Sequence, residues 1–353
     1  GRAAAAPRSR PGARRRRVLE EKRRRQLWFM LALMPELEAL LTAVERLDGA
    51  VLGPESVELL AQNLPPREEG LIMARAAADV PLQEDEVWDT PEEFVLRFVA
   101  IPEYELRVRA WSFLNSIDAV CSKLKGAADD LAKACEFLRN SEGIRQVLAL
   151  VLYIGNYLNG GTPRGRADGF DVETLAKLNS VKASLQLRRE GARSGSTLLD
   201  FVARQMEREH PGLLPQMYDA DREVEGVHRA RRHKLSEIRE EIGRLLGQAE
   251  DYHRHIAQVA PAGDPLAACA GELQAAIARL RELARAVEEA HGKYQSLGLW
   301  FHMDAQKLRP TDEFFGLWDA FFVDLKRAVD ALVRPARPGP GARSTTPRLR
   351  TAP

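Results

Sequence analysis

The fold is decided by the stretch from Gly155 to Phe170, which reads GNYLNGGTPRGRADGF. A phosphate-binding loop would need the pattern GxxxxGK[ST] between a strand and a helix. Here the glycines follow a segment with helical periodicity, and no Lys-Ser or Lys-Thr pair closes the pattern. We therefore interpret the stretch as a helix C-terminus followed by an exposed docking loop, and not as a nucleotide site.

Helical periodicity fills the chain on both sides of this loop. Before it, Ser141 is expected to cap a helix that is apolar on most of its circumference, which predicts a position at the centre of the fold. Its apolar residues are Ile144, Val147, Leu148, Val151, Leu152 and Tyr157. No segment shows the period-two alternation and β-branched enrichment of a strand. The sequence therefore predicts an all-α fold.

Other helices have clear start signals. The tetrapeptide TPEE at residues 90–93 is typical of a capping box, with Thr90 as the cap. The next helix has an apolar stripe that runs from Leu106 to Leu124. A last helix is expected to open with Thr311 as its cap. Its large aromatic side chains must be buried, and they are Phe314, Phe315, Trp318, Phe321 and Phe322.

Two long segments have the three-four spacing of a coiled coil, from Leu235 to Val259 and from Leu273 to Tyr294. The segment 261–265 separates them and offers Asp264 as a cap for the second helix. A short turn between two long helices requires antiparallel packing. The second helix, over residues 265–302, would be on the order of 55 Å long. We therefore predict an elongated domain with an antiparallel coiled-coil rod.

Composition excludes several classes of protein. The 353 residues hold 52 basic and 51 acidic side chains, yet the first 25 residues alone have a net charge of +9. The rest is acidic and does not look like a specific nucleic-acid binder. Three scattered cysteines without a CxxC pair indicate a reducing compartment. No apolar run reaches the roughly 20 residues of a membrane span. Neither metal-ligand spacing nor an activated nucleophile is apparent, so we expect no cofactor, no metal and no enzyme activity.

The glycine-rich loop closely resembles the signature of formin-homology-two domains, in order, spacing and residue type over about 45 residues. The matching residues are GNYLNGG at 155–161, then Arg164, Gly165, Ala167, Gly169, Phe170, Leu175, Lys177, Leu178, Lys182, Leu198, Leu199, Asp200 and Phe201. Residues 93–124 resemble the family's knob-to-post stretch, and the two seams resemble its coiled coil. Within the family, residues 159–161 and 164–170 are most similar to the formin-1/formin-2 group.

The resemblance implies a domain organisation. It covers residues 18–333, with a knob side at 18–125, a post bearing the glycine signature at 126–215, and a coiled-coil rod with the aromatic C-terminal helix at 216–333. The Arg- and Pro-rich tails at 1–17 and 334–353 are predicted to be disordered.

The resemblance also implies a function. Such domains nucleate actin filaments and ride processively on the barbed end in the cytoplasm. They act as head-to-tail homodimers in which an N-terminal lasso of one subunit encircles the post of the other. Actin would be the direct partner, and profilin-actin would be reached only indirectly.

Two actin contacts follow from the same resemblance. Lys182 falls on the family's actin-contacting lysine, and an ammonium group suits an acidic surface. Phe29 aligns with the knob isoleucine and is expected to fill an apolar cleft on actin, while Gln26 and Ala32 replace the usual asparagine and basic residue. The post docking loop, whose glycines allow close backbone approach, comprises Gly155, Asn156, Tyr157, Leu158, Asn159, Gly160, Gly161, Arg164, Gly165, Gly169 and Phe170.

One departure from the family concerns the lasso. It should precede the knob and contain an anchoring tryptophan, yet residues 1–17 hold no aromatic side chain. We therefore expect a domain lacking its lasso, dimeric in the full-length protein and monomeric for the chain as it stands. The alternative is a non-polymerising helical scaffold that docks cytoskeletal partners such as microtubules. Lys182 and the signature favour actin, whereas Phe29 and Ala32 slightly favour the scaffold.

Overall fold

The computed structural model describes residues 14–182, 197–219, 223–261, 263–301, 303 and 308–333. Of these residues 75% are helical, and among them there is one small two-stranded sheet, which confirms the predicted all-α class. The chain forms two compact units, one of residues up to 126 with 237–287 and the other of residues 127–236 with 288 onward. Helices α6 (Tyr104–Asn140) and α13 (Pro265–Trp300) contribute to both units. The residues expected to form the rod and C-terminal helix, 216–333, are divided between the units.

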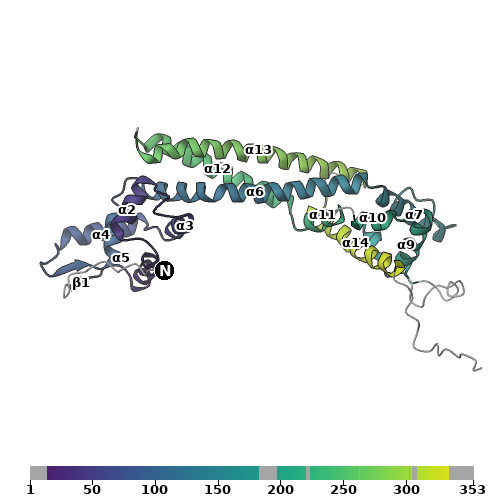
Figure 1. The fold of residues 1–353 in the computed structure, drawn as a ribbon, viewed down its shortest axis with the longest axis horizontal. Coiled ribbons are helices and arrows are strands. Elements are labelled where there is room, and N and C mark those ends of the chain that lie inside the picture. The colour runs from purple at the N-terminus through teal and green to yellow at the C-terminus, as the bar shows by residue number, and fades with distance from the viewer. Residues whose placement is uncertain are drawn as a thin grey trace, which may run out of the picture. The chain divides into compact units, whose positions relative to one another are not determined.

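The first unit contains the short N-terminal elements and the greater part of the coiled coil (Figure 1). Its elements are β1 (Arg14–Arg16), α1 (Glu21–Ala32), α2 (Leu37–Arg46), α3 (Pro54–Gln62), α4 (Arg67–Asp79), β2 (Glu86–Trp88), α5 (Thr90–Phe98), the start of α6, and most of α12 (Leu235–Val259) and α13. Helices α1 to α5 and the first turns of α6 share one apolar core, to which α1 contributes Leu27 and Met30. Among the described residues, no single helix is long and apolar enough to cross a membrane; only the bent pair α1 and α2 meets the length and composition requirements together.

The sheet corrects two expectations. Strand β1 pairs in parallel with β2, with Arg14 opposite Glu86 and Arg16 opposite Trp88. Arg15 and Arg17 bind the Asp89 carboxylate at 2.9 and 3.0 Å. The predicted absence of strands is therefore wrong for residues 14–16 and 86–88. Residues 14–17, expected to belong to a disordered tail, are held by backbone pairing and ion pairs rather than by apolar burial. Residues 1–13 and 334–353 lie outside the described residues.

Helix α5 begins one residue differently from the prediction. Asp89, not Thr90, is its cap and accepts a hydrogen bond from the Thr90 amide at 3.0 Å. The buried carboxylate of Glu92, in the first turn, accepts hydrogen bonds from the backbone amides of Val18 and Leu19. The entry of the chain into α1 is thereby attached to α5.

The antiparallel coiled coil is present, and it contains a third helix. In the first unit α6, α12 and α13 lie side by side (Figure 1) and share an apolar core formed by the predicted stripes. Asp264 caps α13 as predicted, with its Oδ1 accepting from the Leu266 amide at 2.8 Å, and it also pairs with Arg107 of α6. The ring of Phe113 in α6 packs on the ring of Tyr252 in α12, with the ring centroids 5.8 Å apart.

The second unit contains α7 (Glu142–Leu158), α8 (Glu173–Lys177), α9 (Leu198–Glu209), α10 (Leu213–Asp219), α11 (Glu223–Ala230) and α14 (Thr311–Val333), with the ends of α6 and α13. The α14 aromatics are buried as predicted, and Phe322 packs on Phe137 of α6. Thr311 is the first helical residue and not a cap, because its hydroxyl donates to the His233 carbonyl and accepts from the Leu235 amide.

Candidate functional site

Helix α7 has two apolar faces with different surroundings. Ser141 caps it as predicted, and Ile144, Val147 and Val151 are buried. On the other face Tyr153 and Tyr157 are 71% and 78% exposed. The prediction that α7 lies at the centre of the fold is therefore wrong for half of the helix, and the second face is available for a partner.

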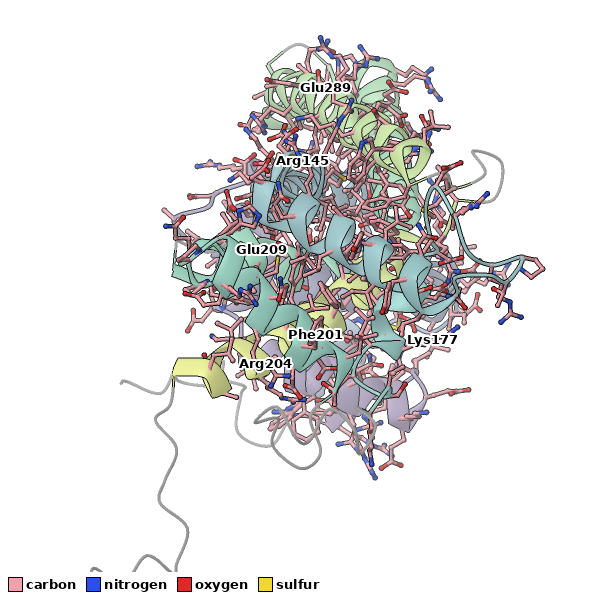
Figure 2. The ribbon with its side chains drawn as sticks, turned by 90° about the vertical axis from the view of Figure 1, so that its right-hand side faces the viewer. Arg145, Lys177, Phe201, Arg204, Glu209 and Glu289 are labelled. Atoms are coloured by element: carbon pink, nitrogen blue, oxygen red, sulfur yellow. The ribbon has the colours of Figure 1, made fainter. Side chains whose placement is uncertain are left out.

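Helix α9 runs beside α7 and forms the other wall of a groove between the two helices. It opens with a capping box in which the Thr197 hydroxyl accepts from the Asp200 amide and the Asp200 carboxylate accepts from the Thr197 amide. Leu199, Val202 and Met206 are buried, and Phe201 points outward. Figure 2 shows Phe201, Arg204 and Glu209 along α9, next to the helix whose first turn carries Arg145.

The two helices enclose a groove of about 1100 Å³ on the surface of the second unit. Its walls are mostly apolar, with polar and charged side chains at the rim. The lining residues are Gln146, Ala149, Leu150, Tyr153, Ile154, Tyr157, Leu158, Val181, Lys182, Thr197, Leu198, Phe201, Arg204, Gln205, Met206, Glu209 and His210. We call this the α7–α9 groove. An apolar hollow with a polar rim is typical of a surface that receives another protein segment.

Lys182 stands at one end of the α7–α9 groove. Its backbone forms an isolated antiparallel bridge with Thr197, and the neighbouring Val181 carbonyl accepts from the Leu198 amide at 2.8 Å. The side chain is exposed. The structure therefore holds the backbone of this lysine against the start of α9 and leaves its ammonium group accessible.

The glycine-rich loop after α7 is held by side chains of the last turn of α7 and of the loop itself. Asn156 donates from Nδ2 to the Ala167 carbonyl at 2.9 Å and accepts at Oδ1 from the Ala167 amide at 2.7 Å. Asn159 donates to the Gly155 carbonyl at 2.7 Å, and the Thr162 hydroxyl donates to the Asn159 carbonyl at 2.8 Å. The loop is thus a defined surface structure and not a strand.

Only some of the glycines are required by the loop itself. Gly161 has a φ of 78°, in the region that favours glycine. A Cβ on Gly165 would lie 2.7 Å from the Asn159 carbonyl oxygen, which is too close. By contrast, Gly155 and Gly169 face open space. Open space for a partner's backbone therefore lies beside Gly155, Gly161 and Gly169, whereas Gly165 is required by the loop itself.

The segment after the loop is attached to the aromatic helix α14 and to the chain before it. Leu175 and Leu178 are buried, and Asn179 donates to Asp324 of α14 at 3.1 Å. Glu173 pairs with Arg309 just before α14. These contacts fix the base of the loop, so that the loop and groove form one preorganised surface.

The other predicted contact residue, Phe29, lies in the first unit on α1. Its side chain is 66% exposed, whereas Leu27 and Met30 on the opposite face are buried. Gln26 donates to the Asn63 side chain at 2.8 Å, and Arg23 pairs with Glu69 at 2.8 Å. Gln26, which replaces the family's asparagine, therefore helps to hold the helix that presents Phe29.

No metal-binding cluster appears among the described residues. His228 instead contacts Asp319 at 3.0 Å, and Arg231 pairs with the same carboxylate at 3.0 Å, in an arrangement that joins α11 to α14. Burial raises the pKa of the Cys135 thiol to about 12, which makes it a poor nucleophile.

The sequence pattern does not predict several groove residues, notably Tyr153, Arg204 and Gln205. One signal was available in Tyr153 and Tyr157, which are four residues apart on a helix with apolar residues on every side. Tyrosine ends in a polar hydroxyl group, so two tyrosines on one face favour a solvent-exposed surface over a buried core. The position of Arg204 and Gln205 depends on how α9 packs on α7, which no local pattern specifies.

Residues 4–326 match the family model described as Formin Homology 2 Domain. The chain belongs to the formin-homology-two family. Its relatives include Formin-2 of Homo sapiens, 33% identical over 172 residues, which are 48% of this chain and 10% of that protein. Formin-C of Dictyostelium discoideum is 32% identical over 196 residues, 55% of this chain and 16% of that protein.

Formin-G of Dictyostelium discoideum is 27% identical over 204 residues, 58% of this chain and 18% of that protein. The chain therefore spans less than a fifth of the length of these formins. Formin-2 and Formin-C match at nearly equal identity, so the affiliation with the formin-1/formin-2 group stays a prediction.

Proposed function

We propose that this formin-homology-two domain binds actin, nucleates filaments and occupies the barbed end during elongation. The observation that carries the proposal is the match of the family model along residues 4–326, which include both the exposed Phe29 of α1 and the α7–α9 groove. Filament binding needs shaped surfaces rather than catalytic groups, and both features are surfaces of that kind.

In this proposal Phe29 and Lys182 contact actin. Phe29 is exposed on a helix whose other face is packed in the core, so it is ready to enter an apolar cleft without rearrangement. Lys182 offers an accessible ammonium group with a fixed backbone. Lysine at such a site suits an acidic actin surface.

The α7–α9 groove is proposed as the docking surface for the lasso of a second copy. Tyr153, Tyr157 and Phe201 expose aromatic rings there, and aromatic contacts supply much of the energy of protein interfaces. Gly155 in the last turn of α7 and Gly161 and Gly169 in the loop have open space beside them, which permits close backbone approach. The chain as it stands is still expected to be monomeric, with a light-scattering mass near 39.4 kDa. A mass of twice that value would contradict the expectation.

A bulk assembly assay with fluorescent actin tests the proposal. The chain should change the rate of filament assembly, and Phe29→Ala and Lys182→Ala should each weaken that effect. Lys133→Ala is the matched control for Lys182, because Lys133 on α6 is another exposed lysine of the same unit and lies outside the glycine signature. No effect of the chain on actin at any concentration, together with co-pelleting on microtubules, would favour the scaffold alternative.

A further inference from the structure

The exposed apolar surface of α1 is larger than Phe29 alone. Trp28 is 53% exposed and Leu33, at the end of the helix, is 74% exposed. The Trp28 ring packs edge-to-face on the Phe29 ring, with centroids 5.6 Å apart and an interplanar angle of 80°. Because the two rings touch, a partner that covers Phe29 must either contact Trp28 or displace it.

The helix that carries these rings is firmly attached to its own unit. Leu27 and Met30 are buried in the core. Arg23 donates to Glu69 and to the Asn63 carbonyl, which adds polar attachments along the same helix. Aromatic side chains on a fixed backbone lose little conformational freedom on binding, so their buried area converts efficiently into affinity.

Charge next to the rings indicates the kind of partner. Lys22 and Arg25 are exposed in the first half of α1. Arg25 follows Lys22 by three residues, and Phe29 and Leu33 follow at steps of four, which places all four residues on one face of the helix. Arg25 pairs with Glu21, so Glu21, Lys22 and Arg25 together give the first half of this surface one net positive charge, and its second half is apolar. This surface is complementary to an apolar cleft with an acidic rim.

We propose that Trp28 is a second anchor for actin beside Phe29, and that Leu33 extends the same contact. The inference rests on the proposed function, because it takes the actin subunit that receives Phe29 as the occupant. Trp28 is the larger ring, and tryptophan is among the residues most often found at interface hot spots. It therefore sets the affinity of the α1 surface at least as strongly as Phe29.

The test is the elongation of preformed actin seeds at increasing concentrations of the 353-residue chain. Trp28→Ala should raise the half-maximal concentration about tenfold or more, the typical cost of removing a hot-spot side chain. Trp28→Phe should have an intermediate effect. Ile72→Ala is the matched control, because Ile72 is also exposed and apolar on α4 of the same unit, and it should leave the curve unchanged. Melting temperatures of all variants report whether the fold is intact.

A second measurement uses the unmodified chain. Hydroxyl-radical oxidation followed by mass spectrometry should show protection of Trp28, but not of Ile72, when actin filaments with free barbed ends are added. A loss of activity in Phe29→Ala with Trp28→Ala unaffected would overturn the second anchor and leave the proposed function standing. If neither Phe29→Ala nor Trp28→Ala changes the elongation of the seeds, the proposed contact between α1 and actin is refuted. Loss of binding to phosphatidylserine vesicles in Trp28→Ala, without any change in elongation, would assign the surface to lipid and overturn the proposal.

Discussion

Replacing Asn156 with alanine should open the glycine-rich loop without unfolding the domain. The side chain of Asn156 makes two hydrogen bonds, both to the backbone of Ala167, at 2.9 and 2.7 Å. Each exposed neutral hydrogen bond contributes about 0.5–1.5 kcal/mol, so their loss should destabilise the closed loop by about 1–3 kcal/mol. Since 1.4 kcal/mol corresponds to a factor of ten, the open population should rise about 5- to 150-fold.

Trypsin provides the assay, because the loop contains Arg164 and Arg166 between the two residues that the bonds join. When opening is fast relative to cleavage, the cleavage rate follows the open population. Mass spectrometry of the bonds after Arg164 and Arg166 should therefore show faster cutting in Asn156→Ala, with an unchanged melting temperature.

Asn140→Ala is the control for this measurement, because Asn140 is an exposed asparagine at the end of α6 in the same unit. Equal cleavage rates at Arg164 and Arg166 in the wild type and Asn156→Ala would refute the argument that the Asn156 side chain closes the loop.

Leu280→Asp should lower the free energy of unfolding by several kcal/mol, because it buries an unpaired charge in the core of the three-helix coiled coil; Leu299→Asp, at an exposed position of the same helix, should change the melting temperature little. Burial raises the pKa of Glu92 despite its backbone hydrogen bonds, so its contribution to stability is complete below its usual pKa of 4.5 and is lost as the pH rises. Urea unfolding should therefore show that the free energy of unfolding of Glu92→Gln rises relative to that of the wild type between pH 4.5 and 7. A difference between the two proteins that does not change with pH would contradict this. The pKa of Asp89 behaves in the opposite way: burial alone would raise it, but hydrogen bonds from Arg15 and neighbouring donors lower it below 3.8. Its contribution is thus present above that pH and lost below, and Asp89→Asn should cost about 1 kcal/mol at pH 7 and less at pH 3 in the same unfolding experiment.

The elements that could be predicted from the sequence are those whose burial has only one solution. The aromatic residues of α14, such as Trp318, had to form a core, and the seam that contains Leu280 had to face another helix. The two apolar faces of α7 were different, because periodicity cannot distinguish a core face from a docking face. Tyr153 was therefore not expected at the surface.

The remaining differences arise from contacts between residues distant in sequence. Strand β1 is held by ion pairs of Arg15 and Arg17 to Asp89, more than 70 residues away, and an arginine-rich segment alone gives no sign of such partners. The hydrogen bonds between Asn156 and Ala167 likewise depend on the path of the loop. The glycine signature identified the family and the position of this surface, but the groove itself required the packing of α9 on α7.

Single-filament fluorescence microscopy with a labelled chain tests the central claim most directly. The account predicts that the label resides at one end of each growing filament, the fast-growing barbed end, and that the elongation rate of that end changes while the label is present. Phe29→Ala and Lys182→Ala should shorten the residence time. Filaments that carry no end-bound label and elongate at an unaltered rate would contradict the account.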